Sequence, residues 1–326
     1  MRYFAGVDLG ASNVRVIVGT ADVDVVGSAR DATTQGPSGI DVTEGVLATI
    51  RSACDDASIA PEQLEAVGIG SFGPFDLAEG MIVDPANLPD TVDRIPLVGP
   101  IGALIDSDRV YLHNDTTAGV IGERFHSARN PDDMVYLTIS TGIGAGIAVD
   151  GHIVNGWDGN AGEVGHFAID PEGRMRCGCG RDGHWEAYAS GSGIPRYACW
   201  LANHADGDVE TDLPIEDPTF SAVDVFDALG NDSLADLTID RVGMWNALGL
   251  ANVVHAYAPL VVSIGGAVAL NNQASIIDPL QDALERLVMA NVPQVQPTAL
   301  GEDVVLHGAL ASAMTAGTGD RSRWEP

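Results

Sequence analysis

One acidic residue of this sequence stands where a general base could act. Asp115 belongs to the segment His113-Asn114-Asp115-Thr116-Thr117-Ala118, between a predicted strand over 110–112 and a predicted helix that begins near Thr116. A carboxylate at a strand end, beside a helix start, is well placed to face a cleft and to accept a proton. The same position also suits a helix N-cap, which carries no chemistry. The residue by itself leaves both interpretations open.

Three turns rich in Gly, Ser, Thr or Asp follow predicted strands. They are Asp8-Leu9-Gly10-Ala11-Ser12-Asn13 after strand 3–7, Ser140-Thr141-Gly142-Ile143-Gly144-Ala145-Gly146 after strand 134–139, and Gly265-Gly266-Ala267-Val268 after strand 260–264. Backbone N–H groups and hydroxyls in such turns converge on anions, and none of the turns has the Lys of a Walker motif. One turn alone is compatible with a plain hairpin, whereas three predict phosphate binding. Asp8 can hold Mg²⁺ through water.

Two cysteines and two histidines indicate a metal site. Cys177, Cys179 and His184 fall within eight residues, and His166 lies eleven residues upstream of Cys177. Such a set suits tetrahedral zinc. With no further ligand nearby to leave an open position, the predicted role is structural, and the alternative is a metal-free loop packed around Trp185.

The charge of the chain is strongly one-sided. There are 46 acidic and 16 basic residues, for a formal net charge of −30, and every basic residue is Arg. An acidic surface without Lys keeps a protein hydrated and dispersed in concentrated salt, so the composition predicts a halophilic source, an archaeon. The same charge opposes nucleic-acid binding. No run of eighteen apolar residues is present, so we expect a cytoplasmic protein without a membrane span.

The order of predicted elements indicates a duplicated α/β fold. The first two turns each join two short strands, and the two units lie about 130 residues apart. Helices are predicted over 40–58 and 241–258, and the acidic segment 205–218 is predicted to be a loop. A chain of 326 residues has room for two such halves.

The three turns resemble the phosphate-1, phosphate-2 and adenosine motifs of the actin-like ATPase fold, which hexokinase and actin share. Within that fold the whole chain resembles the ROK family of sugar kinases, and most of all its glucokinases. The resemblance implies two similar ribonuclease H-like domains, with mixed sheets flanked by helices and an active-site cleft between them. Their implied limits are 1–115, joined by a C-terminal helix near 309–326, and 116–308 with the zinc loop. Two departures occur in the first turn, where the family's Gly-Gly-Thr is Gly10-Ala11-Ser12; Ala11 still permits a tight turn, and Ser12 keeps the hydroxyl.

The resemblance also implies roles for individual residues. Asp115 would be the catalytic base, and His184 would replace the third Cys of the family's zinc site. The implied sugar contacts are Gly73, Asn87, Asn114, Asp115, Glu163, His166 and Glu186. The implied nucleotide contacts are Asp8, Gly10, Ala11, Ser12, Asn13, Thr141, Gly142, Gly144, Gly265 and Gly266, and the implied zinc ligands are His166, Cys177, Cys179 and His184.

The function that follows is an ATP-dependent hexokinase, a glucokinase that uses Mg²⁺ and phosphorylates the 6-hydroxyl of glucose. Fructokinase is one alternative, because Gly70-Ser71-Phe72-Gly73-Pro74 resembles the fructokinase branch; mannose and N-acetylglucosamine are others. ADP or polyphosphate could replace ATP. A non-catalytic, sugar-responsive repressor is disfavoured, because the first strand at Tyr3 leaves no room for a preceding DNA-binding segment. The resemblance favours a homodimer or homotetramer.

Overall fold

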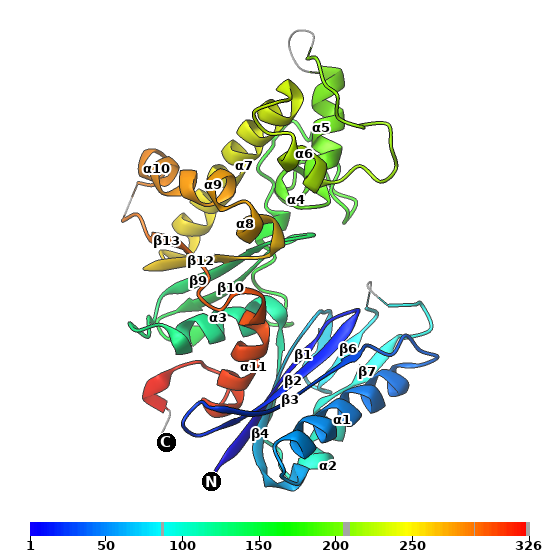
Figure 1. The fold of residues 1–326 in the computed structure, drawn as a ribbon. Helices are drawn as coiled ribbons and strands as arrows, with labels where there is room; N and C mark the ends of the chain where they lie inside the picture. The colour runs from blue at the N-terminus through cyan, green and yellow to red at the C-terminus, as the bar shows by residue number, and fades with distance from the viewer. Residues whose placement is uncertain (86–87, 205–208, 290, 324–326) are drawn as a thin grey trace. The chain divides into compact units, whose positions relative to one another are not determined.

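The computed structural model of the protein describes residues 1–85, 88–204, 209–289 and 291–323. The chain forms two compact units (Figure 1). The first unit comprises 1–136, 146–162 and 302–326, and the second comprises 137–145 and 163–301. The predicted domain limits at 115 and 116 remain a prediction.

The elements up to residue 126 alternate strands and helices. They are β1 (Tyr3–Leu9), β2 (Asn13–Thr20), β3 (Val25–Ala32), α1 (Gly39–Asp56), β4 (Leu64–Ser71), β5 (Phe75–Asp76), β6 (Met81–Val83), β7 (Arg94–Pro96), α2 (Val98–Ile105), β8 (Val110–Asn114) and α3 (Asp115–His126).

The later elements repeat the strand pattern and add more helices. They are β9 (Met134–Ile139), β10 (Ile143–Val149), β11 (His152–Ile153), α4 (Glu186–Ala189), α5 (Gly193–His204), α6 (Ala222–Asp227), α7 (Ser233–Tyr257), β12 (Val261–Gly265), α8 (Ala267–Asn271), α9 (Gln273–Ile276), α10 (Asp278–Leu287), β13 (Gln294–Pro297) and α11 (Val304–Met314). Short 3₁₀ turns occupy Pro61–Gln63, Val164–His166, Gly301–Asp303 and Arg321–Arg323. In the described part of the chain, no helix is long and apolar enough to cross a membrane.

The two five-stranded sheets have the same topology. The first has the order β3-β2-β1-β4-β8 and the second has the order β11-β10-β9-β12-β13. In the first sheet β1 and β2 are antiparallel, as are β2 and β3, whereas β4 is parallel to both β1 and β8. In the second sheet β10 and β11 are antiparallel, and β12 and β13 are parallel. The predicted duplication and the mixed α/β class are therefore confirmed.

Both faces of the first sheet are buried. Alternate side chains of β1 point to opposite faces and enter two different cores. Ala5, Val7 and Leu9 join the core beneath α1, whereas Phe4 joins the core with α3 and α11. Gly6 lies on the second side, where an added Cβ would come within 2.5 Å of the Leu310 backbone nitrogen. The close approach of α11 to this sheet therefore requires a residue without a side chain.

Helix α1 shows how local sequence sets an element. Ser38 stands at its N-cap, and the Ser38 N–H and hydroxyl donate to Asp41 Oδ2 at 3.0 and 2.6 Å, so the acidic side chain of the first turn reaches back to the cap residue. Val42, Val46 and Ile50 recur every four residues and are fully buried. This apolar stripe holds α1 against the first sheet.

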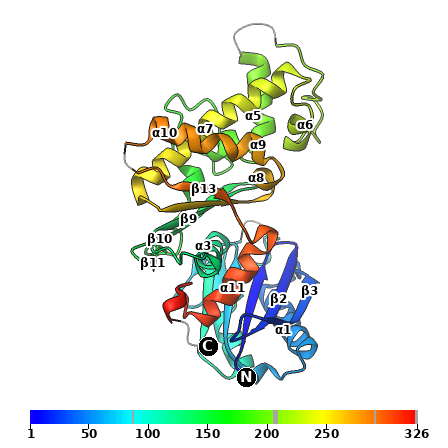
Figure 2. The same cartoon turned by 60° about the vertical axis from the view of Figure 1, so that its left-hand side comes forward.

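In the second unit, α7 is the longest helix, and α10 and α5 pack against it (Figure 2). It begins eight residues before the predicted start, because Asp232 caps it by accepting from the N–H groups of Leu234 and Ala235. Trp185, fully buried, donates from its indole nitrogen to Asn246 of α7 at 2.9 Å. These contacts anchor the end of the predicted zinc loop to the helical layer.

Candidate phosphate, sugar and metal sites

The first predicted phosphate turn lies in the first unit, and hydrogen bonds to its carbonyl groups hold it in place. The Thr33 hydroxyl donates to the Gly10 carbonyl at 2.7 Å, and the Thr33 N–H donates to the Ser12 carbonyl at 3.0 Å. The Gln35 side-chain amide donates to the Ala11 carbonyl at 2.9 Å. The N–H groups of Ala11 and Ser12 find no acceptor among the described residues. A turn with its carbonyls bonded and its amides open is suited to an anion.

The second predicted phosphate turn, in the second unit, has the same design. The N–H groups of Gly191 and Ser192 donate to the carbonyls of Ser140 and Thr141 at 2.7 and 3.2 Å. The amides of Thr141 and Gly142 have no acceptor within the described ranges. Both turns therefore present two adjacent N–H groups.

The third turn, Gly265-Gly266, ends β12 and leads into α8. A cavity of about 290 Å³ lies next to it in the second unit. Its lining comes from α6, from α8 and from the residue after α8, and consists of Ala222, Val223, Phe226, Asp227, Ala267, Val268, Asn271 and Asn272. A small cavity with apolar walls and a few polar groups suits a planar base. The contribution of α6 was not predicted, because only contact in space links it to the third turn.

Asp8, in β1 at the first turn, is paired with Arg15 of β2. Its Oδ2 accepts from Arg15 Nε at 2.9 Å and Nη2 at 2.6 Å. Burial raises the pKa of this carboxyl, while the Arg15 guanidinium acts in the opposite direction. No described residue donates a hydrogen bond to Oδ1. One oxygen is thus fixed and the other is available to a hydrated cation.

The helix N-cap that Asp115 could have supplied is supplied by Asn114. Asn114 Oδ1 accepts from the Thr116 N–H at 2.9 Å and from its hydroxyl at 2.8 Å. Asp115 is the first residue of α3, is exposed, and also accepts from the Thr116 N–H, at 2.7 Å. Because the cap is already provided, Asp115 is not needed for it. The Asn114 Nδ2 group has no acceptor among the described residues.

The predicted sugar residues of the second unit are neighbours. His166 Nε2 and Glu163 Oε2 are 3.8 Å apart, and the Glu163 side chain is 53% exposed. Glu186 accepts from the Ile143 N–H at 2.9 Å, through Oε2. An added Cβ at Gly142 would lie 2.6 Å from that same oxygen. Glu186 therefore ties the second phosphate turn to the loop that carries the other predicted sugar residues.

Two further predicted sugar residues, Gly73 and Asn87, lie outside this group. Gly73 lies in the first unit, and an added Cβ would stand 3.7 Å from Asn160 Oδ1 and 3.3 Å from the Phe75 ring. Asn87 lies outside the described residues.

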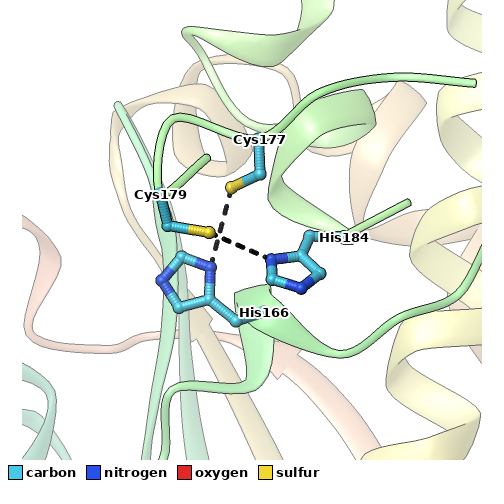
Figure 3. A group of neighbouring side chains, drawn as sticks. All are labelled: His166, Cys177, Cys179 and His184. Atoms are coloured by element: carbon cyan, nitrogen blue, oxygen red, sulfur yellow. Dashed lines mark hydrogen bonds between the residues drawn. The ribbon is translucent and has the colours of Figure 1, made fainter. Parts of the chain in front are cut away.

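The four predicted zinc ligands converge in the second unit. Figure 3 shows His166, Cys177, Cys179 and His184 directed toward a common point, and their ligand atoms all lie within 4.8 Å of one another. His166 Nδ1 is 3.7 Å from Cys177 Sγ, and His184 Nδ1 is 3.3 Å from Cys179 Sγ. A tetrahedral zinc with ordinary bond lengths would separate a sulfur and a nitrogen ligand by about 3.6 Å. The donor set and its spacing fit this metal.

The protonation of the cluster follows from its surroundings. Burial raises the pKa of the Cys177 thiol to about 11, so binding of a metal there would require this thiol to release its proton. Burial lowers the pKa of His184, which favours the neutral imidazole that a metal needs. His166 uses Nδ1 at the cluster and directs Nε2 toward Glu163. One histidine can therefore serve the metal and the sugar residues through different nitrogens.

Comparisons with known proteins identify the family of this chain. The sequence profile of the ROK family matches residues 4–316. The glucokinase of Aeropyrum pernix is 35% identical over 327 residues, which cover 96% of this chain and 97% of that protein.

Two solved structures share the fold. The ROK hexokinase from Thermus thermophilus has a TM-score of 0.79 and 28% identity, covering 94% of this chain and 96% of its own. A ROK family glucokinase from Streptomyces griseus, in complex with glucose and AMPPNP, has a TM-score of 0.70 and 26% identity, covering 94% and 98%. From its sequence and from its fold, this chain belongs to the ROK family.

Proposed function

We propose that this protein is an ATP-dependent glucokinase, which transfers the γ-phosphoryl group of ATP to the 6-hydroxyl of glucose. The observation that carries the proposal is the pair of turns with bonded carbonyls and open amides, found once in each half of a duplicated fold. Relatives that are 33% and 35% identical over nearly the whole chain are glucokinases. Glucose is therefore the first substrate to test.

The nucleotide residues have distinct tasks in this proposal. The open amides of Ala11, Ser12, Thr141 and Gly142 would donate to phosphate oxygens, with the exposed Thr141 hydroxyl as a further donor. The cavity beside Gly265 and Gly266 would take the adenine. The remaining predicted contacts, at Gly10, Asn13 and Gly144, shape the two turns.

Magnesium fits the first turn through Asp8. Arg15 fixes one oxygen of this carboxylate, and the other can accept from water bound to the cation. When bound, Mg²⁺ would neutralise charge on the phosphates.

Asp115 would act as the general base. As the sugar O6 forms its bond to the γ-phosphorus, the bond from phosphorus to the bridging oxygen of ADP breaks, and the O6 proton passes to the Asp115 carboxylate. Asn114, whose Oδ1 is committed to the cap, would donate from Nδ2 to a neighbouring sugar hydroxyl. Glu163, His166, Glu186, Gly73 and Asn87 would complete the sugar contacts.

Zinc would have a structural role at His166, Cys177, Cys179 and His184. Holding His166 by Nδ1 orients its Nε2 beside Glu163, and the loop also ends at Glu186. The metal would thereby keep these three side chains in register.

The test is a coupled assay with Mg-ATP and a hexose panel of glucose, fructose, mannose and N-acetylglucosamine, run in concentrated KCl. We expect the highest kcat/KM for glucose, with glucose 6-phosphate as the product. A higher value for fructose would reassign the substrate within the family. No phosphorylated product from any hexose, with ATP, ADP or polyphosphate as donor, would contradict the kinase function.

We also propose a cellular compartment and an oligomeric state for the enzyme. A kinase of free sugar and nucleotide belongs in the cytoplasm, where both are available, and we propose that it forms a homodimer or homotetramer. Light scattering coupled to size exclusion measures the assembly.

A further inference from the structure

Two arginines face each other across β2 and β3 at the first phosphate turn. Arg15 and Arg30 are directly opposite partners in this antiparallel pair. Like charges at such a position destabilise a sheet. The chain has only 16 basic residues against 46 acidic ones, so two adjacent arginines are unexpected in this composition.

The two arginines differ in their partners. Arg15 is fully engaged: it binds Asp8, and its Nη1 and Nη2 reach Asp303 Oδ1 at 2.6 Å and the Glu302 carbonyl at 3.0 Å. Arg30 forms no ion pair with any carboxylate in the described part of the chain. Its contacts are two long hydrogen bonds, from Nε and Nη2 to Asn13 Oδ1, both at 3.3 Å. The exposed Arg30 head group is therefore uncompensated.

Arg30 also lines a cavity with the open amides. The cavity has a volume of about 400 Å³ and is bounded by the first turn, Asp8, Arg15, Arg30 and Glu302. Asp8 and Arg15 already bind each other, so Arg30 is the guanidinium in this cavity that remains for a ligand. A guanidinium presents parallel N–H donors that match two oxygens of a phosphate group.

We propose that Arg30 binds the phosphates of the nucleotide substrate and acts as the cation that a Lys-free turn otherwise lacks. This inference rests on the proposed kinase function and adds a residue to it. On nucleotide binding, Nε and Nη2 would exchange the Asn13 oxygen for non-bridging phosphate oxygens. The amides of Ala11 and Ser12 would bind the same group from the other side.

The position also explains why the like-charge pair is retained. An arginine kept only for solubility would be more stable at any strand position opposite an acid. Because Asp8 and Asp303 neutralise Arg15, Arg30 changes the stability of the free protein little, and a bound phosphate would supply the anionic partner that its side chain lacks. A substitution of Arg30 should therefore affect nucleotide binding far more than folding.

The experiment compares Arg30→Gln and Arg30→Lys with Arg51→Gln, which removes the same charge from an exposed position on α1. The dissociation constant of AMPPNP with Mg²⁺ is measured by calorimetry without turnover, and KM is measured for ATP and for glucose. We expect Arg30→Gln to weaken AMPPNP about tenfold or more, as for loss of a charged hydrogen bond. Arg30→Lys should recover part of this loss, and KM for glucose should not change.

The free Arg30→Gln protein should melt at nearly the same temperature as wild type, which separates a binding defect from a folding defect. Equal AMPPNP affinities in Arg30→Gln and Arg51→Gln would overturn the inference, as would a wild-type protein that binds no nucleotide. A wild type that binds AMPPNP but phosphorylates no sugar would refute the proposed function alone, because the Arg30 comparison would still be measured.

Discussion

At the scale of single residues, the main result concerns Asn114 and Asp115. Both stand at the start of α3, where an oxygen is needed to cap the helix, and Asn114 provides it. Capping is worth about 1 kcal/mol and is the usual reason for an Asp at such a place. Because Asn114 supplies this cap, the proposed role of Asp115 as general base does not compete with capping.

We expect Asp115→Asn to lower kcat by about 10²- to 10⁴-fold, because the variant cannot accept the proton of the attacking hydroxyl. KM for glucose and for ATP should change little, since the amide keeps the shape of the side chain. Asp282→Asn, at an exposed position of α10, is the control for the lost charge. Steady-state kinetics decide the matter, and a kcat for Asp115→Asn equal to that of the control would contradict the base assignment.

His113, the neighbour of Asn114, predicts a pH dependence of stability. Burial lowers its pKa from 6.5 to about 4, and its Nε2 lies 2.7 Å from the Ser312 hydroxyl. Between these values the unfolded chain binds more protons than the folded protein, so stability is full above pH 6.5 and falls as the pH decreases toward 4. Denaturant titrations should show a loss of about 2 kcal/mol from this residue near pH 5.

The variant His113→Gln should have a shallower decline of unfolding free energy between neutral pH and about pH 4.5 than wild type. His152→Gln, at an exposed position, serves as the matched control. Parallel curves for wild type and His113→Gln would show that another group titrates in this range.

At the scale of elements, the zinc loop joins sequence-distant residues into one cluster. His166 is the last residue of a 3₁₀ turn, and the two cysteines and His184 come from the next bend of the chain. Asp170 braces that bend: its carboxylate accepts from the N–H groups of Glu172 and Arg174 and from the Tyr188 hydroxyl. These hydrogen bonds brace the loop through groups that are not in the cluster.

We expect purified wild-type protein to contain about one zinc per chain by mass spectrometry, and Cys179→Ser to contain far less. Cys179 is exposed, so its loss should spare the core while removing a strong ligand. Cys199→Ser is the matched control, because Cys199 lies outside the cluster. Chelation of the wild type should raise KM for glucose by more than KM for ATP.

A second variant, His184→Cys, separates the ligand role of His184 from a packing role. It restores the family's three-cysteine set and should keep its zinc. Loss of zinc from this variant, or full retention in Cys179→Ser, would contradict the assignment of ligands.

Element types were predictable where the local pattern is strong. The strands before all three turns, the helix after Ser38 and the start of α3 follow from apolar periodicity and capping residues. Strand β10 begins at Ile143, four residues before the predicted start, because Gly144 and Gly146 extend into the sheet. The roles of Thr33, Gln35 and Gly191 were not predictable, since each reaches its turn through contacts in space that no spacing reveals.

At the scale of the whole molecule, the net charge of −30 sets the conditions for stability. Few of the acids can be paired, because the chain has 16 arginines for 46 carboxylates. Repulsion among the rest opposes the compact state unless salt screens it.

We expect the melting temperature to rise by at least about 5 °C between dilute buffer and multimolar KCl, which corresponds to roughly 1–3 kcal/mol for a chain of this size. Calorimetry at a series of KCl concentrations measures the change, and sucrose at matched osmolality controls for general solute effects. A melting temperature that does not depend on salt would contradict the link between this composition and concentrated salt.

The carbonyl groups of both phosphate turns are bonded by residues of the same unit, and these bonds form when the unit folds. Amide hydrogen exchange should then find unprotected N–H groups beside protected strands. These groups are Ala11 and Ser12 in one turn, and Thr141 and Gly142 in the other. Nucleotide would slow these four amides while their neighbours stay unchanged, because the backbone already has its final form. The exchange map of the ligand-free protein would thus mark the proposed phosphate sites in advance.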